Sequence, residues 1–533
     1  MNTFKFYISI FFVTTVTVIA SCNKEVSSTE ALTPLQPANV DANAGTWLPV
    51  FVTSYTKYAA TVPAPADTAS PAYKTELAAI KNLQAALTSG QQKAIDYWSG
   101  GGVLRWNQIF RELVAKYNLP PAPLSNGTYI APDANNPFAD PQFPFSNPPY
   151  AARAYGYVSA AIYDALKATW YYKYQYNRPS PYGVDKGIKS LMPKVNIPSY
   201  PSEEAVMSGV AQTILLALFP AAYDEIMFKA GEQRSAALLA GKASTSDITV
   251  GIALGKAVAA DYIARAGTDG MGAAGGTKAQ WAVLADTAKI HWAKAGVAAK
   301  DVVSWVSLDQ PSRPPMLPFF GTKTSAGLGV KGWMMQNADF IKERPGPPPI
   351  ATQGEMQKQV DEVKHYADNS TRELQGIVLK WADGAGTYTP AGHWNQIAES
   401  YVRDANFSEV RAARAFALLN MAMHDAAVGC WETKYYYYNP RPTQLDPTIK
   451  TGTGIPNFPS YTSGHSTFSS AAAAVLSYLF PDGATYFNDQ ALEASLSRLY
   501  GGIHYRVDIE AGSDHGKRIG GYTVKFAKTD GAN

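Results

Sequence analysis

Three short runs near the C-terminus combine residue types that bind an anion and act on it. They supply three cationic side chains, a Ser-Gly turn, two imidazoles and a carboxylate: Lys434, Arg441, Ser463, Gly464, His465, Arg498, His504 and Asp508. A tetrahedral oxyanion needs such a set, because fixed cations and backbone N–H groups must neutralise its charge away from water. The pattern predicts a site that binds a phosphate-like anion and does chemistry on it.

The second run begins a predicted helix of small residues. The N–H groups of a helix start and the amide of Gly464 can approach an anion closely, and the Ser463 hydroxyl adds a donor. A Ser-Gly pair at a helix start is common. This run therefore becomes specific only together with the other two.

The third run is the most specific of the three. Arg498 can present a bidentate guanidinium to two oxyanion oxygens. His504 and Asp508 are four residues apart, so they share one helical face, where the carboxylate can fix the tautomer and raise the basicity of the imidazole. A purely structural His–Asp pair is the alternative for these two residues alone.

Helical spacing of apolar residues dominates the rest of the chain. It predicts helices over 75–98, 151–169, 202–218, 246–265 and 355–381. Pro-rich and Asn-rich stretches at 119–149 and 311–350 are typical of long loops. Few segments alternate as strands do, so the predicted fold class is all-α.

Segments of the first half recur in the second half at a separation of 261 residues. The run Pro198 to Tyr200 recurs from Pro459 to Tyr461, and Asp247 recurs as Asp508. An internal repeat is a stronger fold signal than local propensity. It predicts two related helical bundles, an N-terminal one over 61–265 and a C-terminal one over 355–533, joined by an irregular insertion at 266–354.

The charged residues of the second half are missing at matching positions of the first. At the same separation, Gly464, His465, Arg498 and His504 are replaced by Glu203, Glu204, Ala237 and Ala243. When the Arg-Pro pairs at Arg178 and Arg441 are aligned, Lys434 falls opposite Tyr171. A set that merely stabilised a bundle would be used in both halves. The first bundle is therefore predicted to be a degenerate scaffold, and the second to hold the site.

The N-terminus resembles a bacterial lipoprotein signal. Lys5 precedes an apolar run that ends in small residues directly before Cys22. We expect residues 1–22 to be the signal, Cys22 to be lipidated, and residues 23–60 to be a polar tether. The expected location is the bacterial cell envelope, lipid-anchored, facing the periplasm or the cell surface. Cys430 is then the other cysteine; it lies in an apolar helical pattern and is predicted to be buried and inert.

Composition limits the classes of function. A hydrophobic content of 46% and an aromatic content of 12% are sufficient for a folded core. A net charge of +3 gives no argument for nucleic acid as a partner, so any positive field must be local.

The three runs resemble the signature of the superfamily of type 2 phosphatidic acid phosphatases (PAP2) and vanadium-dependent haloperoxidases. That signature reads K-x6-R-P, then P-S-G-H, then S-R-x5-H-x3-D. Here six residues separate Lys434 from Arg441, and five separate Arg498 from His504. The middle run departs from it, because Tyr461 and Thr462 are inserted before Ser463 and Thr462 replaces the expected Pro. The duplicated bundle resembles the haloperoxidase branch over nearly the whole chain after the signal.

The resemblance implies roles for these residues. Five of them would hold the equatorial oxygens of phosphate or vanadate: Lys434, Arg441, Ser463, Gly464 and Arg498. His504 would be the axial vanadium ligand, or the nucleophile that forms a phosphohistidine in a phosphatase. His465 would be the acid–base group and Asp508 would orient His504. Asp425 would pair with an arginine of the site, although its match to Asp164 makes a structural helix role an equal alternative.

Two aromatic residues favour the haloperoxidase. Trp431 and Phe458 are predicted to line the pocket mouth, and a dry aromatic wall suits a halide better than a hydrated phosphomonoester. The expected reaction is oxidation of a halide by hydrogen peroxide with vanadate as cofactor. An acid phosphatase acting on phosphate esters at the same site is the nearest alternative, and a non-catalytic surface-binding lipoprotein is a weaker one. No chemical role is predicted for His393 or His424.

Overall fold

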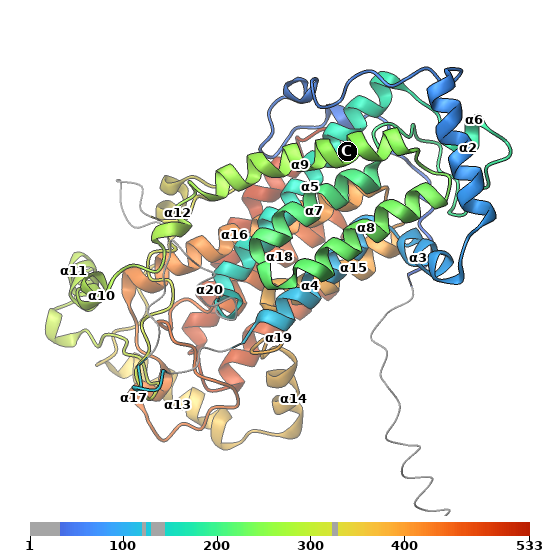
Figure 1. The fold of residues 1–533 in the computed structure, drawn as a ribbon. Helices are drawn as coiled ribbons and strands as arrows, with labels where there is room; N and C mark the ends of the chain where they lie inside the picture. Colours follow the sequence, from blue (N-terminus) through green and yellow to red (C-terminus); the bar gives the residue numbers. More distant parts are fainter. Residues whose placement is uncertain (1–31, 120–123, 129–143, 322–328, 533) are drawn as a thin grey trace, which may run out of the picture. The chain divides into compact units, whose positions relative to one another are not determined.

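Helices account for the regular structure of the chain (Figure 1). The computed structural model describes residues 32–119, 124–128, 144–321 and 329–532. The first half contains α2 (Pro71–Ala85), α3 (Ser89–Ser99), α4 (Gly102–Tyr117), α5 (Pro148–Tyr176), α6 (Pro181–Val184), α7 (Glu203–Leu218), α8 (Tyr223–Leu239) and α9 (Thr245–Ala266). The remainder contains α10 (Lys278–Ala282), α11 (Leu284–Lys294), α12 (Asn337–Glu343), α13 (Gly354–Asp368), α14 (Arg372–Lys380), α15 (Thr389–Asp404), α16 (Glu409–Tyr437), α17 (Pro442–Leu445), α18 (Gly464–Leu479), α19 (Ala484–Tyr500) and α20 (Arg506–Ala527). Over these ranges no strand occurs, and the all-α prediction is confirmed.

The long helices α5 and α16 pack against each other at the centre (Figure 1). Each has 29 residues and ends at a residue with positive φ, Asn177 at 51° and Tyr438 at 53°. A left-handed residue at this position stops a helix and turns the chain. The segments that follow α5 and α16 therefore leave these helices from matching ends.

A matching helix pair completes each bundle. Helix α7 packs on α9 in the N-terminal half, and α18 packs on α20 in the C-terminal half. A side chain at Gly255 would collide with the carbonyl of Val206, and one at Gly516 would collide with the carbonyl of Thr467. The repeated glycines are thus explained by close helix contact.

A buried ion pair recurs in both bundles. Arg153 Nε donates to Asp269 Oδ2 at 2.7 Å, and Arg414 Nε donates to Asp530 Oδ2 at 2.7 Å. Both pairs obey the 261-residue separation that the sequence predicted. The internal duplication is therefore a duplication of contacts as well as of helices.

The segment 266–354 packs on the C-terminal half. It contains α10, α11 and α12 between irregular stretches. Trp292 Nε1 donates to the carbonyl of Tyr437 at 2.8 Å, and the Tyr435 hydroxyl donates to the carbonyl of Met316 at 2.7 Å. This segment therefore covers the end of α16, next to the predicted site.

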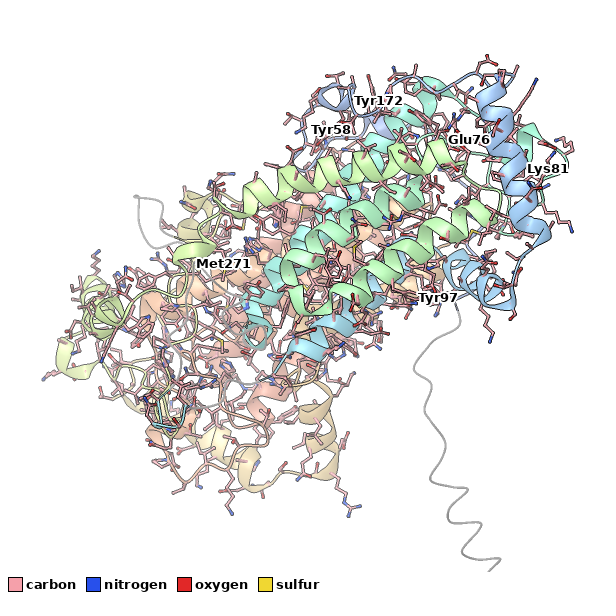
Figure 2. All side chains as sticks on the ribbon, in the orientation of Figure 1. Tyr58, Glu76, Lys81, Tyr97, Tyr172 and Met271 are labelled. Atoms are coloured by element: carbon pink, nitrogen blue, oxygen red, sulfur yellow. The ribbon has the colours of Figure 1, made fainter. Side chains whose placement is uncertain are left out.

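The prediction of a polar tether is wrong from about Asp41 onward. Trp47 and Val52 are buried, and the Tyr172 hydroxyl donates to the carbonyl of Tyr55 at 2.8 Å. Figure 2 labels Tyr58 and Tyr172 on these two neighbouring segments. The sequence interpretation weighted polar residues and missed the aromatic residues among them, which pack on α5.

The predicted lipoprotein signal and Cys22 lie outside the described residues. Residues 34–533 form one compact unit, which contains both bundles and the segment between them. None of its described helices combines the length and the hydropathy required to cross a bilayer. Cys430 is buried, and burial raises the pKa of its thiol, which agrees with an inert thiol.

Candidate active site

A cavity of about 530 Å³ opens at the start of α18. Four of the predicted anion-site residues line it: Gly464, His465, Arg498 and His504. Residues from the other half and from the 266–354 segment contribute to its wall, among them Phe145 and Met316. The second and third runs, which are far apart in sequence, therefore meet at one cavity.

The two basic residues of the first run lie behind this wall. Lys434 Nζ donates to the carbonyls of Pro459 and Ser460, both at 2.8 Å. Arg441 Nη1 donates to the carbonyl of Ile503 at 2.8 Å and lies 3.0 Å from His504 Nε2.

Both basic side chains are almost completely buried. Within the described part of the chain, Arg441 Nη2 has no hydrogen-bond partner. Burial lowers the pKa of Lys434, and Arg441 beside it acts in the same direction. Buried cations of this kind favour an anion as partner.

The start of α18 faces the cavity. The Ser463 hydroxyl accepts from the backbone N–H of Ser466 at 3.3 Å and so caps the helix. A side chain at Gly464 would meet only the rings of Trp431 and Phe468, at 3.8 and 4.0 Å. Packing alone therefore does not require glycine here. Because Gly464 has no side chain, it does not cover the first backbone N–H groups of α18 on the cavity side.

The protonation of the His504 ring follows from its partners. An arginine cannot accept a hydrogen bond, so His504 Nε2 accepts from Arg441 and carries a lone pair. His504 Nδ1 then holds the proton and donates to Asp508 Oδ2 at 2.8 Å. Burial lowers the pKa of His504 well below its ordinary value, and three nearby cations add to the effect: Arg441, Lys434 and Arg498.

Asp508 is itself fixed by other donors. The Ser460 hydroxyl donates to Asp508 Oδ2 at 2.5 Å, and the Tyr505 N–H donates to the same oxygen at 3.2 Å. Burial raises the pKa of Asp508 despite these donors. Asp508 therefore holds the imidazole of His504 in one orientation, and Ser460 and Tyr505 hold Asp508 in place.

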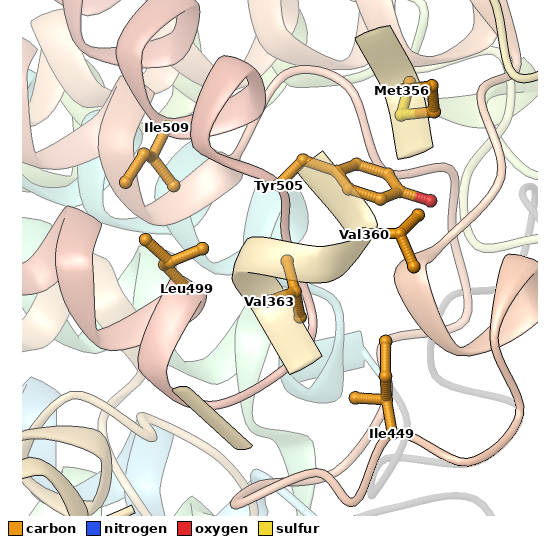
Figure 3. Close-up of a cluster of buried hydrophobic side chains, with 7 residues drawn as sticks. All are labelled: Met356, Val360, Val363, Ile449, Leu499, Tyr505 and Ile509. Atoms are coloured by element: carbon orange, nitrogen blue, oxygen red, sulfur yellow. The ribbon is translucent and has the colours of Figure 1, made fainter. Parts of the chain in front are cut away.

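A hydrophobic cluster fixes the third run (Figure 3). Leu499, Tyr505 and Ile509 each follow directly after one of the residues Arg498, His504 and Asp508, and they point away into a core. Helix α13 covers that core with Met356, Val360 and Val363. Each site residue is therefore followed by an apolar residue that is packed in this core. The packing of the apolar residue fixes the backbone from which the site side chain extends.

Sequence reasoning missed Asp383, which lies between two histidines. His393 Nδ1 is 3.0 Å from Asp383 Oδ1, and His465 Nε2 is 3.5 Å from Asp383 Oδ2. Burial raises the pKa of Asp383, but the hydrogen bond from His393 and the nearby His465 ring outweigh this and hold the pKa below its usual range. His393 was the available sequence signal, and it was given no role.

The environment of His465 keeps its imidazole neutral. Burial lowers the pKa of His465 to about 4, and the positive charge of Arg498 contributes in the same direction. Asp383 opposes both effects. In this structure His465 is therefore a neutral base at physiological pH that faces the cavity.

Trp431 and Phe458 line the cavity. Their ring centroids are 4.8 Å apart, and Phe468 stacks nearly parallel to Trp431 at 6.3 Å. Lys434 Nζ and the Arg441 guanidinium lie 4.9 and 5.0 Å from the Phe458 centroid. The aromatic wall therefore contacts the buried cations directly.

The placement of Asp425 in the pocket wall is wrong. Its carboxylate accepts from the backbone N–H groups of Trp333, Met334 and Met335 at 2.7, 2.8 and 3.2 Å. Asp164 does the same in the first half for the N–H groups of residues 50–52. Asp425 does not line the cavity. Of the two alternatives, the structural one holds, because each Asp ties a distant segment to its central helix.

The alignment of Lys434 with Tyr171 is also wrong. Helices α6 and α17 begin at Pro181 and Pro442, which keeps the 261-residue separation and places Lys173 opposite Lys434. Lys173 Nζ donates to the carbonyl of Pro198, as Lys434 does to that of Pro459. The first half has therefore kept one cation of the set.

The comparisons with known proteins agree with this geometry. The PAP2 superfamily model matches residues 413–531, a range that includes all eight predicted anion-site residues. A bacterial vanadium-dependent iodoperoxidase has a similar crystal structure, with a TM-score of 0.52 and 23% identity, covering 71% of this chain and 91% of that one. For an apo-type bacterial vanadium-dependent chloroperoxidase the TM-score is 0.50 at 13% identity, covering 71% and 94%. No curated protein matches the sequence.

The match of residues 413–531 to the PAP2 superfamily model agrees with the superfamily that the three runs suggested. The comparisons also agree with the prediction of an enzyme of the haloperoxidase or PAP2-phosphatase type. Residues 413–531 thus match the PAP2 superfamily model, and the chain has the fold of the vanadium-dependent haloperoxidases.

Proposed function

We propose that this protein is a vanadate-dependent haloperoxidase that oxidises a halide with hydrogen peroxide in the cavity at the start of α18. The observation that carries the proposal is the pairing of a buried cationic cluster with an aromatic wall. Trp431 and Phe458 border the same cavity as His465 and His504.

The residues present fit a tetrahedral oxyanion. Arg441 Nη2 is buried without a partner within the described ranges, and Gly464 and His465, the first residues of α18, line the cavity. Lys434, Arg441 and Arg498 supply positive charge, and the Ser463 hydroxyl and the Gly464 amide supply neutral donors. This set would hold the oxygens of vanadate or phosphate by charge-assisted hydrogen bonds.

His504 and Asp508 provide the fixed imidazole. The proton on Nδ1 is held by Asp508 at 2.8 Å, so the lone pair lies on Nε2, where it accepts from Arg441 and would face the cofactor once that bond is exchanged. When bound there, vanadate supplies a Lewis acid that activates peroxide toward attack by halide. Asp508 keeps the ring in the tautomer that this needs.

His465 is the proposed acid–base group. Because its pKa is lowered to about 4, the neutral ring can take a proton from hydrogen peroxide. Asp383, 3.5 Å from His465 Nε2, then stabilises the imidazolium that forms. The proton can afterwards be returned to a leaving hydroxide, which then departs as water.

The aromatic wall excludes water from the oxidised halide. Trp431, Phe458 and Phe468 present apolar surface around the site, with Met316 at the wall. A large polarisable halide is held more readily by such a surface than a hydrated phosphomonoester is.

An acid phosphatase is the second candidate. The cavity of about 530 Å³ also admits a phosphate ester, and Arg313 in its wall could contact a second anionic group. In that reaction His504 Nε2 would attack phosphorus, and His465 would protonate the leaving alcohol.

One experiment separates the two. The purified protein is given vanadate and hydrogen peroxide with chloride, bromide or iodide in turn, and halogenation of a phenolic dye is followed. Turnover that needs both vanadate and a halide supports the haloperoxidase. Hydrolysis of an aryl phosphate that vanadate inhibits, with no halogenation by any halide, would reverse the order of the two candidates. The absence of both activities would favour the non-catalytic binding lipoprotein.

Lipid anchoring at Cys22 in a bacterial envelope belongs to the same proposal. Its test is incorporation of labelled palmitate in a bacterial host, compared with Cys22→Ala. Equal labelling of both proteins would reject the anchor without affecting the proposed chemistry.

A further inference from the structure

The N-terminal bundle contains a buried charge cluster at the place that corresponds to the anion site. Glu203 and Glu204 begin α7 as Gly464 and His465 begin α18. Glu203 Oε2 is 2.7 Å from Lys173 Nζ, and Glu203 Oε1 is 2.9 Å from Lys242 Nζ. Two lysines therefore share one carboxylate in the protein interior.

The residues that hold these carboxylates correspond to residues of the C-terminal site. Lys173 corresponds to Lys434, as their common contact with a repeated proline carbonyl shows. Ser202 caps α7 as Ser463 caps α18. The Ser202 hydroxyl also donates to Glu204 Oε2 at 2.8 Å.

A second lysine replaces the histidine of the C-terminal site. Lys242 directly precedes Ala243, the counterpart of His504. Its Nζ is 2.5 Å from Glu204 Oε1 and 2.9 Å from Glu203 Oε1. Positive charge is thus restored one residue away from where the imidazole was lost.

We propose that the N-terminal bundle retains part of the oxyanion cradle of the repeat, namely its lysine and its capped helix start, and closes it with its own carboxylates, so that removing Glu203 opens a second site for a phosphate-like oxyanion.

The charges agree with this substitution. Burial raises the pKa of Glu203, but Lys173 and Lys242 outweigh it and lower the value to about 2, so the carboxylate is ionised. Glu203 and Glu204 together supply about the two negative charges of a phosphate dianion. Lys173 and Glu203 have 0% and 3% side-chain exposure, so each needs the other as a partner.

The available space also agrees. The cavity bordered by Glu203, Glu204 and Lys242 has a volume of about 40 Å³, against about 530 Å³ at the C-terminal site. That is room for about one water molecule and too little for an external oxyanion. The first site is therefore filled by the chain itself.

This inference holds for either proposed reaction, because it concerns binding in the other bundle. Its test uses Glu203→Gly, which restores the residue found at Gly464. The substitution is made in the full-length protein in an Arg498→Ala background, so that the C-terminal site is impaired in both proteins compared. Inorganic phosphate is the probe, and equilibrium dialysis measures the phosphate bound per chain.

The expected result is that Glu203→Gly gains about one bound phosphate over its parent and is stabilised against heating as phosphate is raised. Glu203→Gln, which removes the charge but keeps most of the volume, should gain much less. Adding Lys173→Met to Glu203→Gly should abolish the gain.

A matched control is Asp261→Asn. Asp261 is paired with Lys57 at 2.6 Å in the same half, but both side chains are partly exposed. This change should bind no additional phosphate. The proposal is overturned if folded Glu203→Gly binds no more phosphate than its parent, or if it stays unfolded in phosphate, since the anion should replace the lost carboxylate. Turnover of Glu203→Gly with Arg498 intact reports separately on the proposed function.

Discussion

The two bundles share their helices and their helix contacts but neutralise buried cations differently. In the N-terminal bundle, Glu203 pairs with Lys173 and Lys242. In the C-terminal bundle, Gly464 stands at the position of Glu203, and no described side chain partners Arg441 Nη2. The difference teaches that a binding site can arise from a missing side chain. The same cradle is a structural ion pair where it is filled and a candidate active site where it is open.

The comparison also shows which residues of the C-terminal bundle lower its stability. Burial lowers the pKa values of Arg441 and Arg498 to about 10, so both remain charged without a full set of partners. Buried charges of this kind cost several kcal/mol each unless they are paired. We therefore expect the two halves to respond differently to mutation and to anions.

The largest expected effect comes from His504→Ala, which gives the C-terminal site the residue found at Ala243. Turnover should fall by about 10³-fold or more, because the imidazole that we propose faces the cofactor is lost. Steady-state kinetics of the purified variant measure this. His515→Ala is the matched control, since His515 is equally buried on α20 but does not line the cavity. Equal losses in both variants would mean that His504 acts only through folding.

The next largest effect is expected when the two aspartates that bind distant segments to α5 and α16 are replaced. Asp164→Ala and Asp425→Ala should each lower the free energy of unfolding by about 3 kcal/mol, because each leaves three backbone N–H groups without an acceptor. Denaturant unfolding measures this, with KM determined below the transition. A rise in KM for Asp425→Ala alone, without loss of stability, would restore its place in the pocket wall.

Oxyanions should stabilise only the C-terminal bundle. Phosphate or vanadate at about 100 times its Kd adds about 2.7 kcal/mol to the free energy of unfolding. Hydrogen exchange should show the added protection at the start of α18 and around His504, and none at the start of α7. Arg498→Ala should reduce the response. Equal protection of both bundles in the unmodified protein would contradict the view that the first cradle is already filled.

The smallest effect is expected for Asp383→Asn. Because Asp383 raises the pKa of His465, its loss should shift the acid limb of the pH–rate profile to lower pH. It should also lower kcat by about tenfold, because the imidazolium loses its counter-charge. Asp361→Asn, an exposed carboxylate on α13, is the control. A kcat that falls with no change in the pH profile would assign Asp383 to packing.

Sequence patterns were sufficient for the all-α class and the repeat, and they selected residues that meet at one cavity, Gly464, His465, Arg498 and His504. Motif spacing also pairs His504 with Asp508, because that contact spans a single helix turn. Asp383 was missed because its contact with His465 joins segments 82 residues apart, and no spacing rule reveals such a contact. The path of residues 333–335 over Asp425 was missed for the same reason.

The repeat misled the alignment at one point. The arginine before each proline does not occupy the same place in the two halves, since Arg441 directly precedes α17 whereas Arg178 lies two residues further from α6. Aligning the two arginines therefore places Tyr171, instead of Lys173, opposite Lys434. The helix ends at Asn177 and Tyr438 and the helix starts at Pro181 and Pro442 restore the register.

The hydrogen bond between Arg441 and His504 has a consequence for how the cofactor is acquired. The lone pair on Nε2 that the cofactor would use is already engaged at 3.0 Å by Nη1. An oxyanion binding there would therefore have to draw the guanidinium toward its own oxygens before the ring is released. Loading is then an exchange of partners, so uptake should be slower than simple diffusion into an open cavity. Release of the anion would be followed by return of the guanidinium, which shields the ring until the next encounter.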